Sequence, residues 1–332
     1  MTPPEIPFPV LLQDFFLRRL VAERGVSVHT LASYRDTFEL FLTYLEQHTR
    51  RPASALTLED LDAPHVLAFL DHLEAKRGNS PRTRNLRLTA IRSFLRYVSV
   101  RQPSALPIAQ RVLAIPTKRF DRPALVYLSR EETQALLEAP NPSTWCGQRD
   151  AVLFAVLYNT GARVSEITGL RRADVLLDRA SIQLHGKGRK QRVVPLWKST
   201  ARQLRAWLSR IDHSLDAPVF PNRLGKRLSR HAVIQRLQLA HASAAQRCPS
   251  LAPKRISPHT VRHTAAMHLL QAGVDITVIA LWLGHESIET THLYIEADLQ
   301  MKSDALARIE KTTSAPVRFQ PRDRLLAFLE AL

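Results

Sequence analysis

Apolar residues recur at helical spacing in four successive stretches of the first hundred residues, and this periodicity restricts how the N-terminal part can fold. The second stretch is the clearest, because its large side chains share one helical face, namely Tyr34, Phe38, Phe41, Leu42 and Leu45. Ser80 and Pro81 open the fourth, since serine caps helix N-termini and proline suits the first helical position. The sequence therefore predicts a helical domain whose helices begin near residues 10, 30, 64 and 81.

The second part of the chain mixes helices with a hairpin. Residues 115–123 form a basic segment bracketed by prolines, which fits an extended linker. Ser129 and Glu132 then have the spacing of a capping box that opens a helix. Two short runs, near 181–184 and 192–196, flank a glycine-containing turn and predict paired strands. Helices are predicted at about 130–139, 148–159, 199–210, 229–246, 258–271, 275–282 and 287–295.

These patterns predict a mainly α fold with a small β-sheet in the second of two domains. The predicted boundaries are a helical domain over 1–115, a linker over 116–123, a second domain over 124–310 and a tail over 311–332. The tail ends in a short amphipathic helix at 323–332. That helix either packs on its own domain or docks on a neighbouring protomer.

Positive charge is abundant and segregated along the chain. Lysine and arginine total 47 against 30 aspartate and glutamate, a formal net charge of +17. Residues 76–119 hold eleven cations and no carboxylate, and the ranges 179–211 and 217–274 hold nine each and no carboxylate. Such segregation is typical of a surface that binds phosphates, so a nucleic acid is the expected partner. The alternative is a solvated basic surface without such a partner.

Several other classes of protein are disfavoured. Cys146 and Cys248 cannot form a disulfide framework and lack metal-ligand spacing. His259 and His263 are four residues apart, which can suit zinc, but no glutamate stands between them. The N-terminus does not resemble a signal peptide, and the longest apolar run, 151–158, is too short to span a bilayer. We therefore expect a cytoplasmic protein without metal, cofactor or membrane contact.

Polar residues of the second half supply the parts needed to break a phosphodiester. They are Arg163, Lys187, His259, Arg262, His285 and Tyr294. Guanidiniums make bidentate, charge-assisted contacts with phosphate oxygens, a lysine can deliver a proton, and a phenol can attack. The ordinary pKa of a phenol is near ~10, so forming phenolate at pH 7 costs roughly 4 kcal/mol, which nearby guanidiniums lower. Gly161 is expected to end one helix, so that Arg163 starts the next, and Gly284 is expected to form a turn that directs His285 inward.

The motifs around these residues resemble those of the tyrosine recombinases, also called the phage integrase family, over nearly the full length of the chain. The run Asn159-Thr-Gly-Ala-Arg163-Val-Ser-Glu166 is similar to the family's first-arginine motif, and Ser257-Pro-His259-Thr-Val-Arg262 is similar to its His-x-x-Arg motif. His285 precedes Tyr294 by nine residues, as the family's second histidine precedes its nucleophile. Each motif is weak alone, but together and in this order they are specific.

The resemblance implies a two-domain DNA clamp, in which a helical core-binding domain and a catalytic domain bind opposite sides of double-stranded DNA. It implies that Tyr294 attacks the phosphate and forms a 3'-phosphotyrosine without metal or ATP. Arg163, Arg262 and His285 would stabilise the charge that develops on the phosphate oxygens. His259 would accept the proton of the phenol as general base.

Further residues have supporting roles in this interpretation. Lys187 would protonate the departing 5'-oxygen, and Glu166 would orient Arg163 or His259. His263 and His292 are expected to be bystanders. Contacts with DNA are expected from cations of the basic segments, namely Arg82, Arg84, Arg87, Arg92, Arg96, Lys118, Arg119, Arg189, Lys190 and Arg192.

We expect a site-specific recombinase or integrase that acts as a tetramer on two DNA sites, for integration, excision or transposition of a mobile element. The helical domain begins near residue 10, which leaves no room for the arm-binding domain of many phage integrases. A simple recombinase of the Xer or transposon-borne type is therefore expected. Three alternatives remain: resolution of chromosome or plasmid dimers, relaxation of DNA as by a type IB topoisomerase, and DNA binding without catalysis.

Overall fold

The computed structural model describes residues 5–121, 125–186, 190–285, 291–292 and 294. The chain divides into two compact units, Met1–Arg122 and Pro123–Leu332. The two units have separate hydrophobic cores. In the described part of the chain, no helix is both long enough and apolar enough to cross a membrane.

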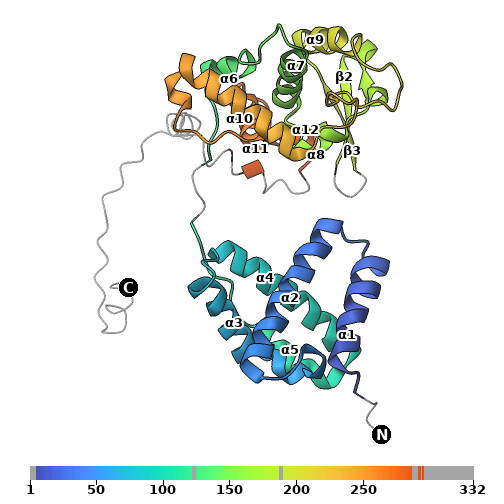
Figure 1. The fold of residues 1–332 in the computed structure, drawn as a ribbon, viewed down its shortest axis with the longest axis vertical. Coiled ribbons are helices and arrows are strands. Elements are labelled where there is room, and N and C mark those ends of the chain that lie inside the picture. Colours follow the sequence, from blue (N-terminus) through green and yellow to red (C-terminus); the bar gives the residue numbers. More distant parts are fainter. Residues whose placement is uncertain (1–4, 122–124, 187–189, 286–290, 293, 295–332) are drawn as a thin grey trace, which may run out of the picture. The chain divides into compact units, whose positions relative to one another are not determined.

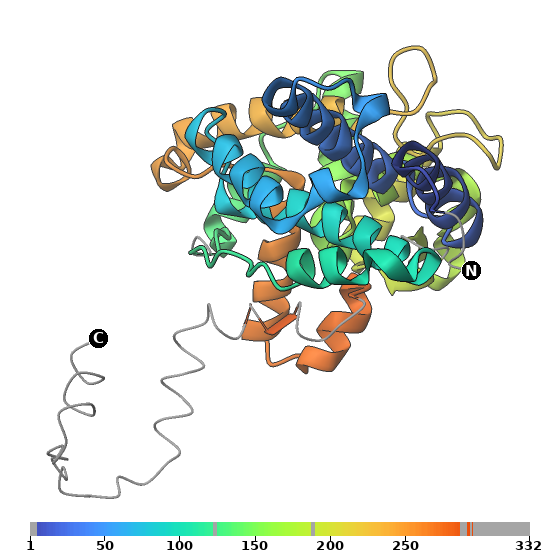
Figure 2. The ribbon, with the colours of Figure 1, turned by 90° about the horizontal axis from the view of Figure 1, so that it is seen from below.

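The N-terminal unit is a bundle of helices (Figures 1 and 2). Its main elements are α1 (Phe8–Asp14), the π-helical segment η1 (Phe15–Glu23), α2 (Val28–Thr49), α3 (Ala63–Ala75), α4 (Pro81–Arg101) and α5 (Leu106–Leu113). The four predicted helices are confirmed, and α5 is an additional short helix that opens at a proline. The side chains of Ser27, Asp62 and Ser80 cap α2, α3 and α4 by accepting a hydrogen bond from the backbone N–H three residues on.

Helix α4 lies at the centre of this unit, because it packs against α2, α3 and α5. Aromatic rings fix its orientation: the centroids of the Phe15 and Phe38 rings lie 5.4 and 5.3 Å from that of Phe94, each edge to face. Such pairs add about 0.5–1.5 kcal/mol beyond the burial of their area. The core therefore determines which arginines of α4 face inward and which face solvent.

The C-terminal unit combines helices with one antiparallel sheet (Figure 1). Its helices are α6 (Arg130–Leu137), α7 (Trp145–Thr160), α8 (Val164–Gly169), α9 (Lys198–Leu208), α10 (Arg230–Arg247), α11 (Pro258–Gln271) and α12 (Ile276–Leu283). The strands β1 (Val175–Leu176), β2 (Ser181–His185) and β3 (Gln191–Pro195) lie in the order β1-β2-β3. In the β2–β3 register Ile182 faces Val194, and both side chains are buried. Helix α7 packs against α9 and α11 at the centre of the unit.

The predicted fold class, mainly α with a small sheet in the second part, is confirmed. The paired strands are found where expected, whereas the two-residue β1 is too short for its own sequence signal. The capping box of Ser129 and Glu132 opens α6 as predicted. Of the helix predicted at 287–295, only 291, 292 and 294 are described, and they are helical. The loop 187–189 and the tail 311–332 lie outside the described residues.

Candidate active site

Two helix ends meet at the centre of the site. Helix α7 ends at Gly161 and α12 ends at Gly284, whose φ angles of +58° and +64° lie in the left-handed region that favours glycine. A Cβ atom on Gly161 would lie 2.4 Å from Cδ2 of Leu283, so the two turns are in close contact. The glycine turns predicted from the sequence are therefore confirmed. They place Arg163, at the start of α8, near the turn that carries His285.

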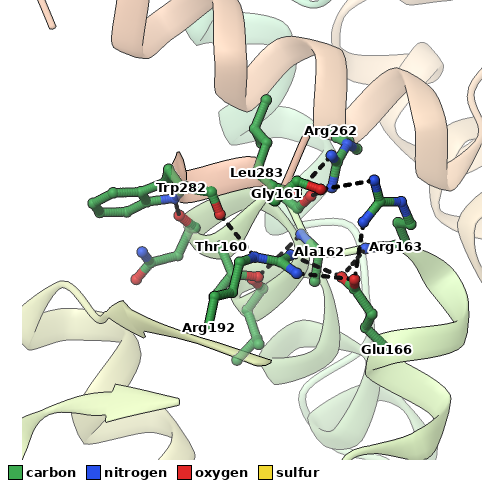
Figure 3. Close-up of polar contacts among 12 residues, drawn as sticks. Thr160, Gly161, Ala162, Arg163, Glu166, Arg192, Arg262, Trp282 and Leu283 are labelled. Carbon is green, nitrogen blue, oxygen red and sulfur yellow. Dashed lines mark hydrogen bonds and ion pairs between the residues drawn. The ribbon is translucent and has the colours of Figure 1, made fainter. Parts of the chain in front are cut away.

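Arg262 on α11 joins these two helix ends (Figure 3). It is only 4% exposed, and its Nη1 and Nη2 atoms donate to the carbonyl oxygens of Gly161 and Leu283, each at 2.7 Å. The last carbonyls of a helix have no partner within the helix, so a buried guanidinium satisfies both. Burial, together with the positive charge of Arg163, lowers the pKa of Arg262 to about 10. The side chain thus remains charged at neutral pH.

Glu166 is the buried carboxylate of the site, and it lies between two arginines (Figure 3). Its oxygens accept hydrogen bonds from Nη1 and Nη2 of Arg192, at 2.9 and 2.8 Å, and from Nη1 of Arg163, at 3.1 Å. Burial acts to raise the pKa of Glu166, but the hydrogen bonds and charges of Arg192 and Arg163 hold it below its ordinary value. The carboxylate is therefore ionised at neutral pH and orients both guanidiniums.

Arg163 is the most open of the three arginines. Its Nη2 donates to the carbonyl oxygen of Gly284 at 3.1 Å, while one third of its side chain remains exposed. Two of its five N–H groups are therefore directed by the protein, and the others can meet an anion from solution. This geometry suits a phosphate held between Arg163 and the turn at His285.

The sequence predicts a DNA contact for Arg192, and the structure shows that its guanidinium is bound within the protein. Its side chain is 12% exposed, its two Nη atoms bind Glu166, and its Nε donates to the carbonyl oxygen of Trp282 at 2.9 Å. A Cβ atom on Gly284 would lie 3.0 Å from Nη1 of Arg192, which shows how closely the guanidinium packs on the turn. Arg192 therefore connects β3, α8 and the end of α12.

Tyr294 lies between two histidines. Its side chain is 1% exposed, and its hydroxyl lies 3.0 Å from Nδ1 of His263. Its ring is nearly parallel to that of His285, with 6.3 Å between centroids. Burial raises the pKa of Tyr294, and the charges of Arg262 and Arg163 oppose that rise. His263, which the sequence marks as a bystander, is thus the side chain in contact with the phenol.

The two histidines of the predicted catalytic set, His285 and His259, differ in burial. His285 is half-buried, with Nδ1 2.7 Å from Oγ1 of Thr291, and burial followed by the charge of Arg262 lowers its pKa to about 4. It is therefore neutral at pH 7. His259 lies at the exposed start of α11, where partial desolvation and then the charges of Arg262 and Arg163 lower its pKa. Lys187 and Arg189 lie outside the described residues.

The cations of α4 divide between core and surface. Arg84 is only 3% exposed and lies 3.5 Å from the Glu74 carboxylate. Nη1 of Arg87 donates to the Ser33 carbonyl and the Thr37 hydroxyl of α2. Arg84 is thus a core residue of α4 and not the surface cation that the sequence predicts, whereas the DNA contact of the half-buried Arg87 stays a prediction. Arg84 stands four residues before Leu88, on the same buried face of α4, so its spacing along the helix predicts burial.

The remaining predicted DNA contacts are mostly at the surface. Arg82, Arg96, Lys118, Arg119 and Lys190 are exposed. The Lys118 ammonium pairs with Glu74 at 2.5 Å. Arg92 is half-buried, and its pKa is lowered by burial and then by Arg96 and Arg84. The like charges that the sequence places four residues apart on α4 thus interact, and an anion would relieve their repulsion.

Positive charge and a phenol come together in the described part of the site. No group of three or more histidine, cysteine, aspartate or glutamate side chains that could hold a metal ion occurs among the described residues. Arg163 and Arg262 supply positive charge, and the charges of both act to lower the pKa of the Tyr294 phenol. Preorganised donors of this kind stabilise charge that develops in a transition state.

Comparisons with known proteins agree with this geometry. Residues 126–301 match the Phage integrase family, and residues 14–102 match the phage integrase N-terminal SAM-like domain. A protein of Sinorhizobium fredii called an integrase/recombinase, y4rC, is 50% identical over 323 residues, which cover 97% of each chain. Tyrosine recombinase XerC of Rhodospirillum centenum is 34% identical over 327 residues, 95% of this chain and 90% of XerC.

A solved structure shows the same fold. It contains XerH site-specific recombinase bound to a palindromic difH substrate. The TM-score is 0.67 at 21% identity, and the match covers 87% of this chain and 82% of XerH. Likeness at this identity shows the fold, whereas the family assignment rests on the sequence matches.

Proposed function

This chain belongs to the phage integrase family of tyrosine recombinases, enzymes that cut and rejoin DNA strands, and we propose that Tyr294 is its nucleophile. The observation that carries the proposal is the position of the phenol. It lies against His263 and His285 and within electrostatic reach of Arg262 and Arg163. A tyrosine in a helix is ordinarily a core residue, but the charges of Arg262 and Arg163 act on this buried phenol.

In the proposed reaction, Arg163 and Arg262 hold the nonbridging oxygens of the scissile phosphate, and His285 donates to one of them. The phenolic oxygen of Tyr294 attacks phosphorus and the 5'-oxygen departs, leaving a 3'-phosphotyrosine. Lys187 is the proposed donor of the proton to the departing oxygen. The phosphotyrosyl bond retains the energy of the phosphodiester, so the reverse attack by a 5'-hydroxyl rejoins a strand without ATP.

We propose a homotetramer on DNA as the active assembly. Exchange between two duplexes requires cleavage of four strands, and each chain offers one proposed nucleophile, so four copies supply one tyrosine for each strand. The tail over 311–332 is proposed to connect neighbouring protomers, because its last ten residues carry an apolar face. Deletion of residues 318–332 should then weaken assembly on paired DNA sites without changing the unfolding of the remaining chain. Unchanged assembly would contradict this role.

Integration, excision or transposition of a mobile element is the proposed biological role. The support is that identity to y4rC, 50%, exceeds identity to XerC, 34%, at nearly complete coverage of both. Resolution of chromosome or plasmid dimers is the second candidate, favoured by the length of the XerC match. An excision assay on DNA that flanks the coding region separates the two: a recombined circle supports the mobile element, and recombination only at a chromosomal dimer site supports resolution.

The chemistry itself is tested with Tyr294→Phe. This variant should bind DNA as the unchanged protein does but should form no covalent adduct with a nicked duplex. A covalent adduct formed by Tyr294→Phe would show that another residue is the nucleophile. Relaxation of supercoiled DNA that lacks paired sites would favour the topoisomerase alternative, and DNA binding with no adduct in the unchanged protein would favour a non-catalytic role.

A further inference from the structure

His263 is the side chain that contacts the proposed nucleophile. Its Nδ1 atom lies 3.0 Å from the hydroxyl of Tyr294, and the two rings meet edge to face with 5.7 Å between centroids. The Tyr294 side chain is 1% exposed, so water does not compete for its hydroxyl in this conformation. His263 directly follows Arg262, whose two carbonyl contacts fix this turn of α11 in place.

We propose that His263 binds the hydroxyl of Tyr294 and accepts its proton as the phenolic oxygen attacks the phosphate. This inference rests on the proposed function and adds the base to it. The proton of the phenol moves to Nδ1 of His263, a bond forms between the phenolic oxygen and phosphorus, and the bond from phosphorus to the 5'-oxygen breaks. The 5'-oxygen takes a proton from the general acid, for which Lys187 is proposed. Rejoining runs these transfers in reverse.

Position distinguishes His263 from His259, the base expected from the motif. A general base must lie within hydrogen-bond reach of the proton that it removes, about 2.6–3.2 Å between heavy atoms. His263 meets this condition. His259 lies one helical turn earlier, with its ring centroid 6.4 Å from that of His263, and its residue is exposed. That place suits contact with a phosphate arriving from solution rather than with the buried phenol.

Electrostatics favour a neutral His263 that becomes more basic when DNA binds. Burial, followed by the neighbouring His259 and Arg262, lowers the pKa of His263 to about 4. The imidazole is therefore unprotonated at neutral pH and can accept a proton. A phosphate bound at Arg262 would offset part of the positive charge that acts on the ring. The base would thus gain strength when its substrate is in place.

The same helix offers a matched control. His268 is a second histidine of α11, and its Nδ1 lies 2.7 Å from the hydroxyl of Tyr158, again with the rings edge to face. This pair lies outside the proposed catalytic set. His263→Phe and His268→Phe therefore remove the same kind of contact, one at the proposed nucleophile and one away from it. His263→Asn is a third variant, which retains a hydrogen-bonding group near Nδ1 but cannot act as a base.

The test measures the rate of covalent adduct formation on two nicked duplexes. One has an ordinary scissile phosphate, and the other has sulfur in place of the departing 5'-oxygen, because a thiolate departs without a proton. His263→Phe and His263→Asn should each slow adduct formation on both duplexes by roughly 10²-fold, within the usual range for a general base. Lys187→Ala should be slow on the ordinary duplex only. His268→Phe should react like the unchanged protein on both.

The pH dependence separates a base from a merely structural group. Without His263 the phenol must ionise unaided, so the rate of His263→Asn should rise with pH between 7 and 9, while the rate of the unchanged protein changes less. His263→Asn that reacts at the unchanged rate overturns the inference. A lower rate with an unchanged pH profile, or recovery on the sulfur duplex, overturns it as well. Absence of any adduct from the unchanged protein would refute the proposed function instead.

Discussion

Substitution of Arg192 tests whether this side chain holds the site together or binds DNA. Arg192→Met removes two hydrogen bonds to the Glu166 carboxylate and one to the Trp282 carbonyl. Breaking a buried ion pair costs about 3–5 kcal/mol, and the lower end applies because Arg163 remains beside Glu166. We therefore expect the free energy of unfolding to fall by about 3 kcal/mol. Arg192→Lys keeps the charge but not the planar fork, so a loss of about 1–2 kcal/mol is expected.

The assay follows urea unfolding by tryptophan fluorescence. All four tryptophans, Trp145, Trp197, Trp207 and Trp282, belong to the C-terminal unit, so their signal reports the unit that contains Arg192. Arg202→Met is the matched control, because Arg202 is exposed on α9. Two results together would refute the structural role and support a DNA contact of Arg192 instead. The unfolding midpoint of Arg192→Met would be unchanged, and the salt dependence of its DNA binding would be weaker by about one phosphate contact.

Three further predictions concern a turn, the basic helix and the buried carboxylate. Gly161→Ala should lower the free energy of unfolding more than Gly273→Ala. Gly273 also has a positive φ, of +80°, but a Cβ there would have no atom within 4 Å, so it bears only the backbone strain of about 1–2 kcal/mol. Equal losses would contradict the close contact between Gly161 and Leu283. Arg82→Met should reduce the slope of log K against log salt by about 0.9, whereas Arg84→Met should leave that slope unchanged; mobility shifts at several salt concentrations check both. The stability advantage of the unchanged protein over Glu166→Gln should be complete above about pH 5 and shrink as the pH falls below about 4; a constant gap in urea midpoints would contradict the lowered pKa.

Local signals in the sequence sufficed for much of the fold. Capping side chains such as Ser80 and Ser129 act within one turn of their own helix, so their spacing predicts where α4 and α6 begin. Glycines at the ends of α7 and α12 act in the same local way. The positions of these turns follow from the sequence, and they bring two helix ends of the site together.

Contacts between distant segments were not predictable in this way. Arg192 lies ninety positions before Trp282, and His263 lies thirty-one before Tyr294, so no spacing within one element relates them. Their neighbouring residues also favoured other interpretations, since Arg192 stands in a basic run and His263 beside a conspicuous arginine. Arg84 is different, because its four-residue spacing from the buried Leu88 indicates burial on the same face of α4. Only its positive charge favoured a contact with DNA.

The most direct test of Tyr294 as the nucleophile is to map the covalent bond itself. The unchanged protein is reacted with a nicked duplex, the adduct is digested with protease and nuclease, and the modified peptide is sequenced by mass spectrometry. Attack by Tyr294 should leave a nucleotide joined through its 3'-phosphate to this tyrosine, with a 5'-hydroxyl on the released strand. A nucleotide joined to another residue, or joined through a 5'-phosphate, would contradict it.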